Sequence, residues 1–176
     1  RVYKKVVNRD IRVGVSNFFN NLSFPINFVN NILQLKIKNA LEELARFSIN
    51  STFGLVGFFD PAKRNLNLEP HPEDFGQTLG RYGAGPGPFL VLPIFGPSTL
   101  RDTTGLIVDT AIQTAVYNEV LDNASDDAEI KAALTIIGGI DTRHRTAFRY
   151  YQSGSPFEYD LIRLLYLEQR KIVIAK

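Results

Sequence analysis

The sequence contains no cysteine. A chain without cysteine cannot form a disulfide, a thiolate metal site or a cysteine nucleophile. It has only two histidines, His71 and His144, which lie far apart in the sequence. A zinc site would therefore have to rely on carboxylates. We expect no metal ion and no cofactor.

An excess of charge of one sign is also missing. The chain has 20 Lys and Arg against 18 Asp and Glu, a formal net charge of +2. A dedicated nucleic-acid-binding protein usually has a strong basic excess, so no nucleic-acid partner is expected. With 44% hydrophobic and 22% charged residues, the composition is that of a globular protein, and 176 residues predict a single domain over 1–176.

Long hydrophobic runs are absent as well. The longest strictly apolar run covers residues 89–95, and Pro93 interrupts it. A helix that crosses a bilayer needs about 20 predominantly apolar residues. A conventional transmembrane helix is therefore not expected.

Three stretches carry no charge at all, namely residues 13–35, 47–59 and 82–100. The first of them mixes apolar side chains with six asparagines and a glutamine. Uncharged amides among apolar residues allow two interpretations. The amides are either satisfied inside buried helices, or they belong to an element at a lipid interface, where charges are costly and amides are tolerated.

Apolar residues recur at the helical period from residue 11 to residue 22, which predicts a first helix there. Pro25 suits the first turn of a second helix, because its missing N–H would be unpaired there in any case. A third helix is predicted from Ile37, with Leu41 and Leu44 on one face and Arg46 in solvent. The second helix has an amide face made of Asn27, Asn30, Asn31 and Gln34.

Prolines and glycines interrupt the middle of the chain. Residues 60–74 predict a loop with a short helix near 62–65, and residues 75–82 predict another short helix. Residues 89–95 are expected to be extended.

Capping residues indicate the later helices. Ser98 is predicted to cap a helix that runs to about Tyr117. Ser125 and the capping box over 155–158 predict two further helices. The sequence therefore predicts an all-α fold of about six to eight helices with connections broken by proline and glycine.

The glycine run at Gly83, Gly85 and Gly87 has a superficial likeness to a phosphate-binding loop. Such loops work through consecutive backbone N–H donors. Pro86 and Pro88 remove two of these donors, and no lysine follows. A bent loop or hinge is the better interpretation.

No G-x-S-x-G nucleophile motif is present. His71 lies close to Glu73 and Asp74, so it is either a general base or a loop residue that forms local hydrogen bonds. Arg101 and Asp102 are neighbours at a helix start, where Asp102 suits the helix dipole. Arg101 either takes part in a structural ion pair or contacts a lipid phosphate. We expect no catalytic residue.

Ordered motifs along the chain identify a family. The most specific block is residues 69–83, with the sequence EPHPEDFGQTLGRYG. It is preceded by NSTFGLVG over 50–57 and followed by GPSTLRD over 96–102. The sequence resembles the MlaA (VacJ) lipoproteins of Gram-negative outer membranes.

The resemblance implies a helical disc that sits in the inner leaflet of the outer membrane and contains an amphipathic channel. Such a protein removes phospholipids from the outer leaflet. It associates with a trimeric porin, passes lipid to a soluble periplasmic carrier and performs no enzymatic step. The lipidated cysteine of the family would lie before Arg1, so a lipid anchor is expected in the longer precursor.

Within this scheme we assign a lipid path and a gate. The gate is the loop formed by Gly83, Gly85, Pro86, Gly87 and Pro88. Two alternatives remain open. One is a soluble lipid- or peptide-binding helical domain without a channel, and the other is a hydrolase that uses His71 with Glu73 or Asp74. The residues expected to contact lipid are Asn27, Asn30, Asn31, Gln34, Phe75, Tyr82 and Arg101.

Overall fold

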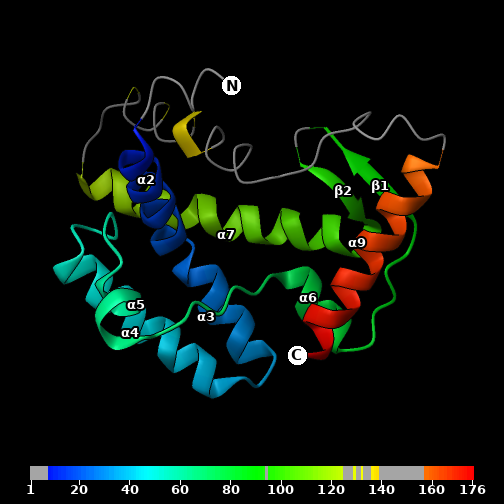
Figure 1. Ribbon diagram of the computed structural model, residues 1–176, viewed down its shortest axis with the longest axis horizontal. Coiled ribbons are helices and arrows are strands. Elements are labelled where there is room, and N and C mark those ends of the chain that lie inside the picture. The colour runs from blue at the N-terminus through cyan, green and yellow to red at the C-terminus, as the bar shows by residue number, and fades with distance from the viewer. Residues whose placement is uncertain (1–7, 94, 125–128, 130–131, 133–135, 139–156) are drawn as a thin grey trace. The chain divides into compact units, whose positions relative to one another are not determined.

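The computed structural model describes residues 8–93, 95–124, 129, 132, 136–138 and 157–176 (Figure 1). The chain groups into two compact units. Unit 1 comprises Arg1–Glu73 and Ile112–Asp141, and unit 2 comprises Asp74–Ala111 and Thr142–Lys176. The prediction of a single domain over 1–176 stays a prediction.

Unit 1 is built from α2 (Arg9–Leu22), α3 (Phe24–Leu33), α4 (Ile37–Phe53) and α5 (Pro61–Leu66). Pro25 lies in the first turn of α3, and the Asp60 side chain caps α5 by accepting a hydrogen bond from the Lys63 N–H. The rings of Phe24 and Phe47 stack with centroids 4.4 Å apart, which packs α3 against α4.

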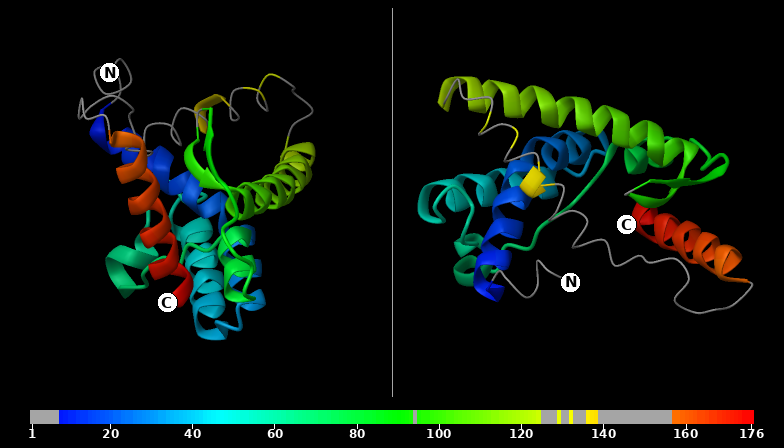
Figure 2. Two further views of the ribbon diagram at one scale, coloured as in Figure 1. Left: turned by 90° about the vertical axis from the view of Figure 1, so that its right-hand side faces the viewer. Right: turned by 90° about the horizontal axis from the view of Figure 1, so that it is seen from above.

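Unit 2 contains α6 (Phe75–Arg81), the antiparallel strands β1 (Phe89–Leu92) and β2 (Gly96–Thr99), the start of α7 (Leu100–Ala124), and α9 (Glu158–Ala175). Helix α9 runs beside the hairpin and α6 (Figure 2). The Phe89 ring meets the rings of Tyr159 and Tyr166 edge to face, with centroids 5.5 and 6.1 Å apart.

The close approach of α6 and α7 depends on two glycines. A Cβ on Gly105 would lie 2.3 Å from the backbone nitrogen of Gly76, and a Cβ on Gly76 would lie 2.7 Å from a carboxylate oxygen of Asp102. Neither position has room for a side chain. The pair therefore allows Asp102 to reach residues of α6.

The all-α prediction is confirmed, with one small hairpin added among the described residues. The expected helices over 11–22, after Pro25 and from Ile37 are present, as are the two short helices at 61–66 and 75–81.

The predicted start of the seventh helix is wrong. Residues 96–99 pair with β1, so Ser98 lies in a strand and α7 begins at Leu100. Thr99 provides the cap instead, because its hydroxyl accepts a hydrogen bond from the Asp102 N–H at 3.2 Å. Helix α7 also runs further than predicted, to Ala124.

The predicted start of the last helix is also wrong. Helix α9 begins at Glu158, and Phe157 precedes it without a side-chain cap. Glu158 and Asp160 occupy its first turn, where acidic residues complement the positive end of the helix dipole. Ser155 and the helix expected after Ser125 fall largely outside the described residues.

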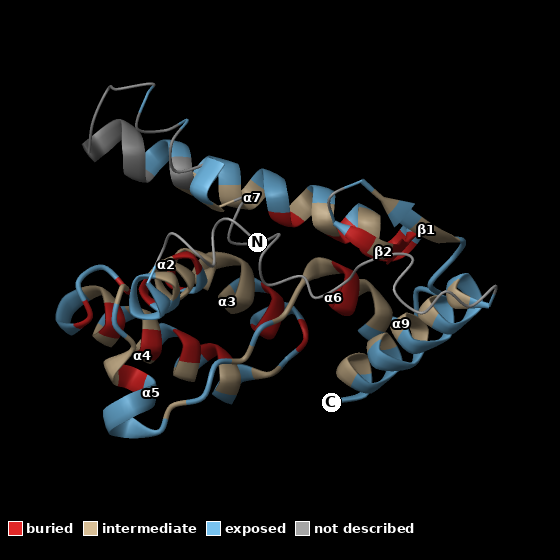
Figure 3. Cartoon of the chain, turned by 45° about the horizontal axis from the view of Figure 1, so that its top comes forward, coloured by how far each residue is buried: buried red, intermediate tan, exposed pale blue. Residues whose placement is uncertain are grey.

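The predicted orientation of α4 is reversed. Leu41 and Leu44 are exposed, whereas Arg46 and Glu43 are buried. Figure 3 shows buried positions along α4. Arg46 can lie inside because Asp60 supplies its counter-charge. The face of α4 that points into the protein interior is thus the face that carries Glu43 and Arg46.

Candidate functional site

The interior of the described protein is polar, and its surface is rich in large apolar side chains. Asn30, Asn31 and Thr99 are the largest fully enclosed side chains. Among the described residues, the buried hydrophobic side chains are those of Phe19, Ala40 and Ala62. In a protein surrounded by water the usual distribution is the opposite. Exposed apolar residues of unit 1 include Ile32, Leu35, Ile37, Leu41, Leu44, Phe53, Leu55 and Val56.

The amide face of α3 forms hydrogen bonds inside its own helix. The Asn30 side chain donates to the Ile26 carbonyl at 3.0 Å, and the Asn31 side chain donates to the Asn27 carbonyl at 2.8 Å. Each amide thus satisfies a donor without needing a charge nearby. This confirms that the amides form internal hydrogen bonds, as one of our two interpretations expected.

The same amides hold the proline-rich segment over 67–73. The Asn31 side chain also donates to the His71 carbonyl at 3.0 Å, and the Glu73 N–H donates to the Asn27 side-chain oxygen at 3.3 Å. The Gln34 side chain donates to the Glu73 carboxylate at 2.9 Å. The structure therefore brings these three predicted residues together, with the segment after α5 as their shared partner.

Carboxylates of α4 complete this attachment. Glu43 accepts a hydrogen bond from the His71 N–H at 2.6 Å. The His71 ring lies 2.6 Å from Glu42, and this hydrogen bond is the main reason why the pKa of Glu42 lies below its ordinary value. Glu73 instead forms an ion pair with Lys36 at 2.7 Å. The alternative of a hydrolase that pairs the His71 ring with Glu73 or Asp74 is therefore not supported, because the partner of the ring is Glu42.

A buried ion pair joins α4 to the start of α5. The Arg46 guanidinium lies 3.0 Å from the Asp60 carboxylate and also donates to the Leu68 carbonyl. The Asn50 side chain donates to Asp60 at 2.9 Å and accepts from the Ala62 N–H at 3.1 Å. Burial is the largest single influence on Asp60 and would raise its pKa. The hydrogen bonds from Arg46, the Lys63 N–H and Asn50, together with the charge of Arg46, outweigh burial, so the pKa lies below its ordinary value.

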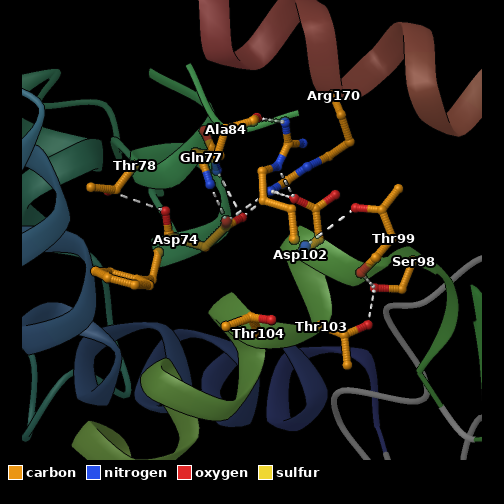
Figure 4. Close-up of polar contacts among 12 residues, drawn as sticks. Asp74, Gln77, Thr78, Ala84, Ser98, Thr99, Asp102, Thr103, Thr104 and Arg170 are labelled. Atoms are coloured by element: carbon orange, nitrogen blue, oxygen red, sulfur yellow. Dashed lines mark hydrogen bonds and ion pairs between the residues drawn. The ribbon is translucent and has the colours of Figure 1, made fainter. Parts of the chain in front are cut away.

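Unit 2 has an ionic cluster around Arg170, which α9 contributes (Figure 4). Arg170 binds Asp74 through two hydrogen bonds of 2.7 and 2.8 Å and reaches Asp102 at 2.9 Å. The Tyr166 hydroxyl donates to Asp102 at 2.8 Å. Arg101 donates to the same carboxylate at 2.9 Å, so the structural ion pair proposed for Arg101 is present.

These contacts shift the ionisation of the cluster. Burial is the largest single influence on both carboxyl groups and would raise their pKa values. For Asp74 it is outweighed by the hydrogen bonds and charge of Arg170 together with hydrogen bonds from Gln77. For Asp102 it is outweighed by the hydrogen bond from Arg101, the charge of Arg170 and the hydrogen bonds from Tyr166 and Arg170. Both pKa values therefore lie below the ordinary value. Burial and the neighbouring Asp102 raise the pKa of Tyr166, so its hydroxyl remains a donor.

The glycine loop is exposed over its whole length, from 83 to 88. Gly83 and Gly87 have φ angles of 89° and 67°, in the region that favours glycine. Gly85 does not have a positive φ, and a Cβ there would meet nothing within 4 Å. The end of the loop is held where the Leu100 N–H donates to the Pro88 carbonyl at 3.0 Å and the Arg101 N–H to the Pro86 carbonyl at 3.2 Å.

The remaining predicted residues lie in unit 2 near this loop. Tyr82 follows α6 and is 69% exposed. Phe75 opens α6, and its N–H donates to the Asp109 carboxylate at 3.0 Å. Whether these residues and the α3 amides contact lipid stays a prediction.

Sequence reasoning missed several residues of both polar clusters. Arg46 and Asp60 directly flank the uncharged stretch 47–59, and such flanking charges must find partners if the stretch is withdrawn from water. The position of these two charges next to the uncharged stretch was therefore a signal in the sequence for a buried ion pair. Nothing in the spacing of Asp74 and Arg170, which are 96 residues apart, predicts their contact.

Two further features concern the described residues as a whole. Among them, no group of three or more histidine and carboxylate side chains is arranged to hold a metal ion. None of the helices that the structure describes is long and apolar enough to cross a bilayer.

Comparison with known proteins places these features in a family. The family model for the MlaA lipoprotein matches residues 1–172. The uncharacterized protein RP093 of Rickettsia prowazekii is 40% identical over 116 residues, which cover 65% of this chain and 46% of that protein. The intermembrane phospholipid transport system lipoprotein MlaA of Haemophilus influenzae is 38% identical over 110 residues, which cover 62% and 44%.

The protein of the same name in Escherichia coli is 39% identical over 109 residues, which cover 61% of this chain and 43% of that protein. The matched segment thus spans less than half the length of these relatives. A solved chain described under "Structural basis for maintenance of bacterial outer membrane lipid asymmetry" superposes with a TM-score of 0.71 at 28% identity, covering 98% of this chain and 84% of that one. With a family model that matches nearly its whole length, the chain belongs to the MlaA lipoprotein family.

Proposed function

We propose that this chain is the helical domain of an outer-membrane lipoprotein that removes phospholipid from the outer leaflet and passes it to a soluble periplasmic carrier. The observation that carries the proposal is the reversed distribution of polarity. Amides and ion pairs fill the interior, while large apolar side chains lie outside.

A lipid environment accounts for this distribution. Exposed leucine and isoleucine side chains are favourable against acyl chains, while polar groups at membrane depth face the protein interior and find partners there. Leu41 is 59% exposed on α4, and Arg46 is buried on the same helix. We place the domain within one leaflet, on the periplasmic side, with its exposed apolar side chains against lipid.

The relatives support the substrate class. The Haemophilus influenzae and Escherichia coli proteins are named as lipoproteins of an intermembrane phospholipid transport system. By extension we propose phospholipid as the cargo of this chain. Its path would be an amphipathic channel. The candidate lipid contacts are the α3 amides within unit 1 and, separately, Phe75, Tyr82 and Arg101 within unit 2.

Two surfaces suit the remaining roles. The outer face of α9 exposes Leu161, Leu164 and Leu165, and it would dock against a trimeric porin. The exposed loop over 83–88 would form one wall of the lipid path and adjust its width. The positive φ angles of Gly83 and Gly87 make those two glycines, rather than Gly85, the residues that set its bend.

Membrane extraction and lipid analysis test the proposal. The full-length protein should require detergent for release from outer membranes and should carry phospholipid detectable by mass spectrometry. Cells that lack their own family member should show less surface phospholipid once the protein is expressed. The Leu41→Asp variant should lose this activity, because it places a charge against acyl chains, whereas Asn65→Asp on the exposed side of α5 should keep it.

The result that would contradict the proposal is equally direct. A protein that is monodisperse in water without detergent, carries no phospholipid and leaves the surface phospholipid level unchanged is not a membrane lipid transporter. In that case the soluble binding domain without a channel would be the better account.

A further inference from the structure

The C-terminal helix reaches the glycine loop through a continuous set of polar contacts. Arg170 and Tyr166 of α9 both donate to Asp102, at 2.9 and 2.8 Å. The Oδ1 atom that Arg170 contacts also accepts from Arg101 Nε at 2.9 Å. Arg101 Nη1 then donates to the Ala84 carbonyl of the loop at 3.3 Å.

The two central groups of this relay are enclosed. The side chains of Arg101 and Asp102 are 7% and 6% exposed. In such surroundings polar contacts are strong, and a charge that loses one partner is costly to keep in place. A change at Arg170 is therefore expected to displace Asp102, and with it Arg101.

The loop has few other restraints. Its residues are exposed, and a Cβ at Gly83 or Gly85 would meet nothing within 4 Å. Backbone hydrogen bonds hold it at its two ends, where the Ala84 N–H donates to the Leu79 carbonyl and the Arg101 N–H to the Pro86 carbonyl. The guanidinium of Arg101 is the side chain that fastens Ala84 from within the unit.

We propose that Arg170 and Tyr166 are positioning residues for the loop over 83–88, and that they act through Asp102 and Arg101. The conformations of α9 and of the loop are then coupled, although the helix does not touch Ala84 through these residues. The consequence for lipid passage rests on the proposed function. The coupling itself does not.

Hydrogen exchange of the full chain in detergent tests the coupling. The reporters are the N–H groups of Ala84, Leu100 and Arg101, which bond to residues of the loop or its flanks. Arg170→Gln should raise their exchange about tenfold, and Tyr166→Phe, which removes a single hydrogen bond, about threefold. The N–H of Gln34, bonded to the Asn30 carbonyl in unit 1, should not change.

Two controls separate positioning from general loss of structure. Arg163→Gln changes an exposed arginine on the same helix and should leave the reporters unchanged. In an Arg101→Gln background, Arg170→Gln should add little to the exchange of Ala84, because the last link of the relay is already broken. Arg170→Lys keeps the charge but not the paired geometry, and it should give an intermediate result.

The outcomes are distinct. Unchanged exchange at Ala84 in both Arg170→Gln and Tyr166→Phe overturns the proposal, as does an equal effect of Arg170→Gln with and without Arg101. If Arg170→Gln also raises the exchange of the Gln34 N–H, its effect is general unfolding. The exchange of Ala84 in Tyr166→Phe then decides whether α9 positions the loop. The proposed function fails if expression of the unaltered protein does not change the surface phospholipid of the cells. The coupling between α9 and the loop is tested separately, by the exchange data alone.

Discussion

The two units both have polar interiors, but they build them from different chemistry. In unit 1 neutral amides of α3 donate to carbonyls four residues earlier, as Asn30 does to Ile26. In unit 2 the central contacts join charged groups that are distant in sequence, as Arg170 and Asp74 are. Amides need no counter-charge, so they can be satisfied locally, whereas ions require partners that the fold must bring to them.

This difference predicts how each unit responds to perturbation. Unit 2 should depend on the ionisation of two carboxyl groups. In unit 1 the amide contacts inside α3 should be indifferent to ionisation. The carboxylates of Asp60, paired with Arg46, and of Glu73, paired with Lys36, should be the ones that matter there.

Acid should give the largest effect and should separate the units. The folded pKa values of Asp74 and Asp102 lie below the ordinary 3.8, so their contribution to stability is present above that value and is lost as the pH falls through the lower folded values. Between about pH 6 and about pH 2.5, hydrogen exchange corrected for its intrinsic rate should rise in α9 and α6 before it rises in α3. If α3 loses its protection from exchange at the same pH as α9 and α6, or at a higher pH, the two units do not differ in their dependence on carboxyl ionisation.

Arg46→Ala should be the most damaging single change in unit 1. It leaves the Asp60 carboxylate buried without its cation, at a cost of about 3 kcal/mol in the free energy of unfolding. Denaturant unfolding in detergent measures this cost. The exposed Arg64→Ala on α5 serves as the control and should change stability by less than about 0.5 kcal/mol. Equal effects of the two variants would mean that the pair contributes nothing.

Asn31→Ala tests whether neutral amides matter less than ions. The side chain is fully buried and donates to the Asn27 and His71 carbonyls, so its loss should cost about 2 kcal/mol. The effect should also be insensitive to pH, unlike that of changes in unit 2. Asn65→Ala on the exposed side of α5 is the matched control. If Asn31→Ala lowers the free energy of unfolding as much as Arg46→Ala does, buried amides do not matter less than buried ions.

The smallest effect is expected in the glycine loop. Gly87→Ala places a Cβ at positive φ and 3.2 Å from the Leu100 Cβ, which should cost about 1 kcal/mol. Gly85→Ala points into open space and should be close to neutral. Melting temperatures of the two variants measure the difference. If Gly85→Ala were the more destabilising, the bend of the loop would lie elsewhere.

Local patterns in the sequence predicted much of unit 1. The helical period, Pro25 and the amide face of α3 follow from residues close together in the chain. The side of α4 that faces inward could not be read from its apolar residues, because the rule that leucines lie inside assumes water outside. Arg46 was therefore expected in solvent and lies in the interior.

Unit 2 was less accessible to sequence reasoning. Glycine, proline and serine at 96–98 favour a helix start, but residues 96–99 pair with β1 and form a strand instead. Two partners of Asp102, Tyr166 and Arg170, come from α9, more than sixty residues later. No local pattern contains that contact.

The central claim is that the apolar surface of both units faces lipid. Since the chain has no cysteine, a single cysteine can carry a spin label without background, at Leu41 in unit 1, Leu164 in unit 2 or the exposed Asn65 on α5. In vesicles, labels at Leu41 and Leu164 should collide with oxygen and be shielded from a water-soluble nickel complex, with the reverse at Asn65. Labels at Leu41 and Leu164 that meet the nickel complex as readily as the label at Asn65 would contradict the account.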